Sequence, residues 1–120
     1  MERIELLVDS GSEPAGSVDE LSSRVPEQKE EWLERLGMAA AGREESLRFP
    51  AYVLSERPSK NFQVIGMLLK TIQLFGKEHE YPKTVVLACL SEDDATMYRQ
   101  VYNFYIPNTK DERMNAGLWD

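Results

Sequence analysis

An unbroken run of six apolar residues, residues 85–90, constrains the fold of this chain more than any other stretch. A run without alternation is typical of a strand that is covered on both faces, and such strands are usually parallel and central in their sheet. Ser91 follows at the position of a helix N-cap, with Glu92, Asp93 and Asp94 in the next turn, where the helix dipole favours carboxylates. The pattern predicts a buried strand followed directly by a helix.

A long helix is predicted before this strand. Apolar residues recur there at intervals of three or four, which places them on one side of a helix. They are Phe62, Ile65, Leu69, Ile72 and Phe75. Gly76 and then Tyr81-Pro82 are expected to end the helix, because proline disfavours helical geometry in the residue before it.

Two more strands and one more helix are predicted upstream. Residues 3–9 form a short strand that starts the sheet and ends in the turn-rich segment 10–17. Residues 46–54 form the second strand, in which Pro50 implies an edge or strand-end position because it removes a ladder donor. A helix opens at Val25-Pro26 and stops near Gly42. Its expected buried stripe is Trp32, Leu33, Leu36 and Ala40.

These elements predict an α/β fold, with a small, mainly parallel three-stranded sheet and about three helices. At 120 residues the chain is expected to form one domain over residues 1–107, followed by a tail at residues 108–120 that contains Trp119. The tail is polar until its last three residues. Trp119 is expected either to dock on the body or to meet a partner.

The charge of the chain argues against two classes of function. The formal net charge is −7, with 14 basic and 21 acidic residues, so we expect no general binding to nucleic acid or to an anionic membrane. One cysteine and one histidine leave no ordinary set of ligands for zinc, and we expect no metal or cofactor. No apolar run approaches a membrane span and no signal peptide opens the chain, which favours a cytoplasmic or otherwise intracellular protein.

The loop between the second strand and the long helix is the candidate ligand site. In an open parallel α/β sheet, ligands bind beyond the carboxyl ends of the strands. Arg57 and Lys60 lie beside the predicted helix N-terminus, which would suit an anion, although an ordinary solvated loop remains the alternative. The candidate binding residues are Ser55, Arg57, Ser59, Lys60 and Asn61, with Leu90 at the end of the central strand.

No catalytic residue is predicted. Cys89 lies inside the predicted buried strand, where a small core residue is the expected role. His79 lies near the end of the long helix, where it is expected to cap the carboxyl terminus. The acidic cluster of Glu27, Glu30, Glu31 and Glu34 is expected to be a solvated helix face rather than a paired-carboxylate site.

From Ser46 to Tyr102 the chain resembles the distal part of a macro domain, the ADP-ribose-binding α/β fold. The resemblance lies in the spacing of a strand, the end of a helix, a turn, a second strand and an acidic triplet. The matching residues are Ser46, Phe49, Pro50, Ala51, Lys70, Thr71, Phe75, His79, Pro82, Val85, Cys89, Glu92, Asp93 and Tyr98. Tyr105, Ile106 and Pro107 also resemble the Tyr-Phe-Pro that closes some members.

The chain departs from the family at its ligand-binding segments. It contains no Gly-Asp-Ile-Thr, no Asn-Ala-Ala-Asn and no triple-glycine loop. Val53, Leu54 and Ser55 stand where the family has Ser-Thr-Gly, and Leu90 stands where an aromatic residue often lies near adenine. Side chains in place of the loop glycines obstruct the close approach of backbone N–H groups to a diphosphate.

Two functions therefore remain open. The first is a non-catalytic macro-like module that acts as a protein-interaction or regulatory domain, with a protein partner or a second copy covering a sheet edge. The alternative is a binder of ADP-ribose or a related nucleotide through the loop 55–61.

Overall fold

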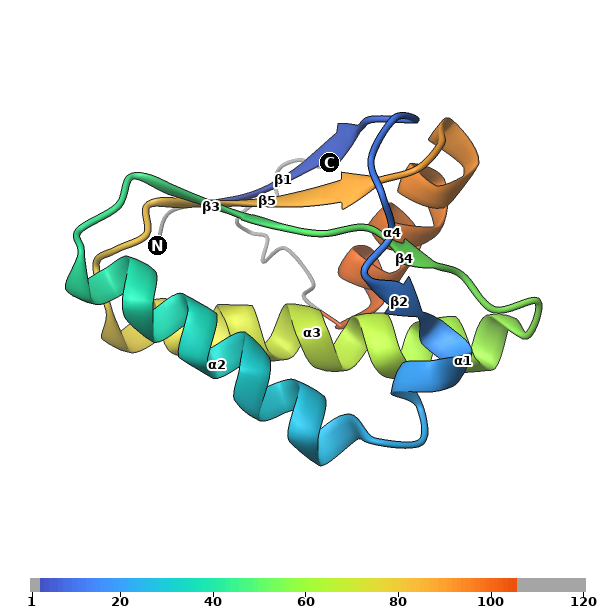
Figure 1. The fold of residues 1–120 in the computed structure, drawn as a ribbon, viewed down its shortest axis with the longest axis horizontal. Helices are drawn as coiled ribbons and strands as arrows, with labels where there is room; N and C mark the ends of the chain where they lie inside the picture. The colour runs from blue at the N-terminus through green and yellow to red at the C-terminus, as the bar shows by residue number, and fades with distance from the viewer. Residues whose placement is uncertain (1–2, 106–120) are drawn as a thin grey trace.

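The computed structural model describes residues 3–105, which fold into a sheet with helices on one of its faces (Figure 1). The sheet has three parallel strands in the order β1–β5–β3. They are β1 (Arg3–Val8), β5 (Thr84–Cys89) and β3 (Ser46–Phe49). The predicted α/β class, the parallel three-stranded sheet and the central position of the strand around residues 85–90 are confirmed.

Three long helices pack on this sheet. They are α2 (Val25–Ala41), α3 (Pro58–Glu78) and α4 (Glu92–Tyr105), and a short helix, α1 (Val18–Leu21), precedes them. In Figure 1, α2 and α3 run beneath the sheet and α4 lies at the end where β5 terminates. None of the helices within residues 3–105 is long and apolar enough to span a membrane.

The strand register separates the two faces of the sheet. Ile4, Val85 and Leu47 lie side by side, and the next row on the same face is Leu6, Leu87 and Phe49. These residues belong to or pack against the core cluster beneath the sheet. The opposite face carries rows such as Glu5, Val86 and Arg48, and no described helix covers it (Figure 1).

A second, two-stranded sheet corrects the predicted strand at residues 46–54. The chain leaves the main sheet after Phe49, and β4 (Tyr52–Val53) pairs in parallel with β2 (Gly16–Ser17). Pro50 has no N–H for a ladder, which explains the break and confirms its strand-end position. The predicted loop at residues 10–17 is wrong at its end, because Gly16 and Ser17 form β2 and lead directly into α1.

The buried stripe of α2 differs from the predicted one. Trp32 and Leu36 are buried as expected, but Leu33 is 39% exposed. The observed stripe is Gln28, Trp32, Leu36 and Ala39, with steps of four, four and three residues, and the predicted Ala40 is only half-buried. The helix ends at Ala41 with Gly42 at its C-cap, as predicted. All four carboxylates of the acidic cluster on α2 are exposed, as expected.

The long helix α3 continues beyond its predicted end. Gly76 lies inside the helix, which runs to Glu78 and has His79 at its C-cap. A single glycine lowers helix stability by about 1 kcal/mol relative to alanine, which the surrounding packing overrides. The helix buries Ile65, Leu69 and Ile72 as predicted, whereas Phe62 and Phe75 are only half-buried.

The last helix, α4, begins as predicted. The hydroxyl of Ser91 accepts a hydrogen bond from the backbone N–H of Asp94 at 3.1 Å. Helix α4 buries Ala95, Tyr98 and Val101 against the core. The predicted tail, residues 108–120 with Trp119, and the Ile106-Pro107 part of the macro resemblance lie outside the described residues.

Candidate functional site

The loop after β4 lines a hollow of about 540 Å³. Ser55, Arg57 and Lys60 lie on its wall together with Val53, Leu54, Glu56 and Asp19. The hollow therefore brings together three of the six predicted site residues, namely Ser55, Arg57 and Lys60. Ser59 is exposed in the first turn of α3, and neither Ser59 nor Leu90 is among the residues that line the hollow.

Asn61 has a structural role. Its side chain is buried at 2% exposure and lies against the backbone of Ser55. The Asn61 Oδ1 atom accepts a hydrogen bond from the Ser55 N–H at 2.8 Å, and its Nδ2 donates to the Ser55 carbonyl at 2.9 Å. Because both ends of the amide are engaged, Asn61 fixes the loop on α3 rather than facing a ligand.

Asp19 faces the two cations of the hollow, and the sequence reasoning missed it. Its carboxylate lies 3.4 Å from the ammonium group of Lys60. A hydrogen bond from Ser55 holds the pKa of Asp19 below its ordinary value of 3.8, and Lys60 adds to this effect while burial opposes it. The hollow therefore already contains an acidic partner for one of its cations.

The sequence contains a local signal for α1, the helix that carries Asp19. Ser17 and Glu20 have the Ser-x-x-Glu spacing of a capping box. In the structure the Ser17 hydroxyl accepts a hydrogen bond from the Glu20 N–H at 3.2 Å. The signal predicts the start of α1, but only the pairing of β2 with β4 brings this helix to the loop.

Cys89 and His79 lie at opposite ends of β5. Cys89 is 1% exposed, and burial raises the pKa of its thiol from 9.0 to about 11. His79 precedes the strand, with its Nδ1 atom 3.0 Å from the Phe75 carbonyl oxygen and its ring stacked on that of Phe75. The buried role of Cys89 and the helix-end position of His79 are confirmed. Within residues 3–105, no three His, Cys, Asp or Glu residues are grouped as metal ligands.

The open edge of β1 is a second candidate site. The Arg3 N–H donates to the Lys83 carbonyl and the Asp9 N–H donates to the Cys89 carbonyl, at 3.3 and 2.8 Å. Backbone groups alternate in direction along a strand, so the odd-numbered residues of β1 face β5. Ile4, Leu6 and Val8 direct their N–H and C=O groups away from the sheet, where no strand within residues 3–105 pairs with them.

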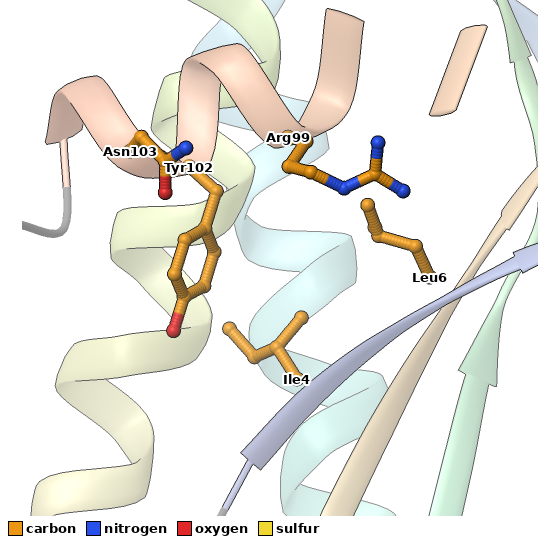
Figure 2. A pocket seen from close by; sticks show the side chains of 5 residues that line it. All are labelled: Ile4, Leu6, Arg99, Tyr102 and Asn103. Atoms are coloured by element: carbon orange, nitrogen blue, oxygen red, sulfur yellow. The ribbon is translucent and has the colours of Figure 1, made fainter. Parts of the chain in front are cut away.

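A groove of about 470 Å³ runs between this strand and α4 (Figure 2). Figure 2 shows Arg99 and Tyr102 reaching from α4 toward Leu6 and Ile4 on β1, with Asn103 at the far end. Leu7 and Val8, at the end of the strand, are 40% and 38% exposed. The edge therefore combines unpaired backbone groups with a partly apolar groove.

Polar side chains bridge the sheet face that the helices leave uncovered. Arg48 donates hydrogen bonds from β3 to the carboxylate of Asp9 at 3.1 Å and to the hydroxyl of Ser12 at 2.7 Å. The Arg48 guanidinium holds the pKa of Asp9 below its ordinary value of 3.8, with help from the backbone N–H of Gly11. Arg3 forms an ion pair with Glu5 at 2.7 Å on the same face. Exposed pairs of this kind stabilise a fold by about 0–1 kcal/mol.

No family model, no curated protein and no solved structure matches this chain. The resemblance to a macro domain therefore stays a prediction from the sequence.

Proposed function

We propose that the chain is a non-catalytic, macro-like binding module that acts as a protein-interaction or regulatory domain, and that the open edge of β1 is its interaction surface. The observation that carries the proposal is the row of outward-facing backbone groups at Ile4, Leu6 and Val8 beside the α4 groove. An extended segment that adds to a sheet edge gains main-chain hydrogen bonds from such a row and specificity from neighbouring pockets.

The size and position of the groove support strand addition. The groove is lined by two apolar side chains of β1 and by Arg99, Tyr102 and Asn103 of α4. Alternate side chains of an added strand would point toward this groove, because side chains alternate between the two faces of a sheet. Charged or polar groups on α4 would then select among segments that fit the edge.

A strand-forming peptide tests this proposal. The probe is a peptide of alternating threonine and valine with a lysine at each end, which favours the extended state and suits an acidic protein. Added to the isotope-labelled chain, it is expected to shift the amide NMR signals of Ile4, Leu6 and Val8, with a dissociation constant on the order of 0.1–1 mM.

Two variants at one position provide the control. The Val8→Pro variant loses the outward N–H of residue 8. No hydrogen bond to β5 is lost, because this N–H faces away from the sheet, and proline is tolerated at such a position. Val8→Ala keeps the N–H and shortens the side chain. We expect peptide binding to weaken at least tenfold in the proline variant and little in the alanine variant. Signal changes confined to another surface would contradict the proposal.

A second candidate function is binding of ADP-ribose or a related nucleotide in the hollow beside α3. The observation that favours it is the convergence of Arg57 and Lys60 on a hollow of about 540 Å³ at a helix N-terminus. The ion pair of Lys60 with Asp19 opposes it, because an anionic ligand would have to compete with that carboxylate.

Calorimetric titration with ADP-ribose tests this candidate. On this hypothesis the chain binds ADP-ribose with a dissociation constant on the order of 1–100 µM, and Arg57→Ala combined with Lys60→Ala abolishes the binding. The matched control is Lys29→Ala with Lys77→Ala, which removes one exposed charge from α2 and one from the opposite end of α3. Equal affinity in both double variants would exclude the loop, and no heat in the unmodified chain would exclude the candidate.

A further inference from the structure

We propose that the partner at the β1 edge is a second copy of this chain. This inference rests on the proposed function of that edge. The two copies of β1 pair antiparallel about a two-fold axis at Leu6, which joins the two sheets in the strand order β3–β5–β1–β1–β5–β3. A two-fold contact is isologous, so one self-complementary strand is sufficient to form it.

The backbone directions limit the possible registers. In an antiparallel pair, hydrogen-bonded residues lie directly opposite each other and exchange both bonds. The outward groups of β1 belong to Ile4, Leu6 and Val8. A symmetric pairing must therefore place these even-numbered residues opposite one another, and the two-fold axis must lie at a residue rather than between two residues.

Charge then selects one register among those that pair most of the strand. With the axis at Glu5, the two Glu5 side chains would face each other. With the axis at Leu7, Glu5 would face Asp9 twice. Like charges directly opposite each other destabilise a sheet. With the axis at Leu6, Arg3 faces Asp9 at both ends of the pairing, and Glu5 faces Leu7.

The register at Leu6 also matches the apolar side chains. On the helix-covered face, Leu6 would meet Leu6 of the second copy, and each Ile4 would meet a Val8. Val8 is 38% exposed in the single chain, and Ile4 and Leu6 line the groove. Because the axis is perpendicular to the sheet, both helix layers lie on the same side and the two grooves face each other. The pairing therefore buries apolar surface that the single chain leaves open.

Sedimentation equilibrium of the full chain tests the inference. We expect a reversible monomer–dimer equilibrium with a dissociation constant on the order of 1–100 µM, typical of a modest interface. The Val8→Pro variant is expected to dimerise at least tenfold more weakly, and Val8→Ala is expected to lie between it and the unmodified chain. Circular dichroism of each variant checks that the fold is kept.

Two charge variants test the register without touching the backbone. Arg3 is 68% exposed at its side chain, so its replacement leaves the core intact. Arg3→Glu places one carboxylate opposite Asp9 at each of the two ends and is expected to raise the dissociation constant about fivefold or more. Glu5→Gln is expected to change the dissociation constant of the dimer by less than about twofold if the axis lies at Leu6. With the axis at Glu5 or at Leu7, the same variant would form a tighter dimer, because a like-charge contact is removed.

The outcomes separate this inference from the proposed function. A chain that stays monomeric while the threonine–valine peptide binds its edge would overturn self-pairing and keep the edge as a site for another protein. A monomeric chain that does not bind the peptide would overturn both. A dimer that is unaffected by Val8→Pro and Arg3→Glu uses another surface, which also overturns the inference.

Discussion

The Trp32→Ala variant is expected to lose about 3–5 kcal/mol of unfolding free energy. Trp32 is 1% exposed and belongs to the core cluster between α2 and the rest of the fold. Its indole N–H donates a hydrogen bond to the hydroxyl of Tyr52 on β4 at 3.1 Å. Removing the ring leaves a cavity and also an unpaired hydroxyl.

The cost is large because domains of this size are stable by only about 5–15 kcal/mol. Chemical denaturation followed by circular dichroism measures it. The expected result is a lower transition midpoint at an unchanged denaturant slope, since the surface exposed on unfolding is similar. A loss below about 1 kcal/mol would mean that the surrounding side chains collapse into the space, and that Trp32 is not a centre of the core.

Two conservative variants separate the packing of Trp32 from its hydrogen bond. Tyr52→Phe removes the acceptor and leaves the buried indole N–H without a partner, which is expected to cost about 1–3 kcal/mol. In the Trp32→Phe background there is no N–H to satisfy, so Tyr52→Phe is expected to cost less. Equal costs in both backgrounds would show that the 3.1 Å contact contributes little to stability.

Local sequence patterns correctly predicted the central strand, the start of α4 and the end of α2. The apolar run at residues 85–90 predicted a central parallel strand. The expected cover on both faces is met only in part, because the described helices lie on one face, and on the other face Ala88 is buried but Val86 is only half-buried. Ser91 predicted the start of α4, since an N-cap acts within one turn of its own residue. Gly42 marked the end of α2 for a similar local reason.

The features that the sequence did not predict depend on pairing between strands that are far apart in the chain. Strands β2 and β4 have two residues each, which is too short for a periodic pattern, and they pair across 36 positions of the chain, Gly16 with Tyr52. Asp19 reaches the loop 55–61 only through that pairing. The open edge of β1 also depends on the order of the sheet, because the same residues in a central strand would have no open edge.

At the predicted site, the residue types indicated that the whole loop binds an anion. The contacts show that some of these residues line the hollow and that another holds the loop in place. Arg57 and Lys60 do line one hollow, as the loop position suggested. Asn61 was chosen as a polar group near a helix N-terminus, but its amide binds the backbone of Ser55. The sequence alone does not distinguish an amide that binds a ligand from one that fixes its own loop.

The Gly66→Ala variant is expected to be less stable than the unmodified chain by about 1–3 kcal/mol, although alanine favours helices. Gly66 lies in α3 where α4 crosses it closely. A Cβ atom at this position would lie nearer to three ring carbons of Tyr105 than real Cβ atoms approach a neighbour. The overlap is expected to push the end of α4 away from α3.

A matched glycine provides the control. Gly37 lies inside α2, and a Cβ atom there would meet nothing within 4 Å. Gly37→Ala is therefore expected to stabilise the chain by about 0.5–1 kcal/mol through helix propensity alone. Thermal unfolding of the two variants should move the midpoint in opposite directions. Two stabilised variants would contradict the close packing of α3 on α4.

Removing the ring of Tyr105 should reverse the effect at Gly66. In a Tyr105→Ala background, Gly66→Ala is expected to raise the unfolding free energy by about 0.5–1 kcal/mol, as Gly37→Ala does. The comparison also bears on the β1 edge, because α4 supplies Arg99, Tyr102 and Asn103 to the groove. If Gly66 sets the distance between α3 and α4, then Gly66→Ala alone should weaken binding of the strand peptide, and the double variant with Gly37→Ala should weaken it no further.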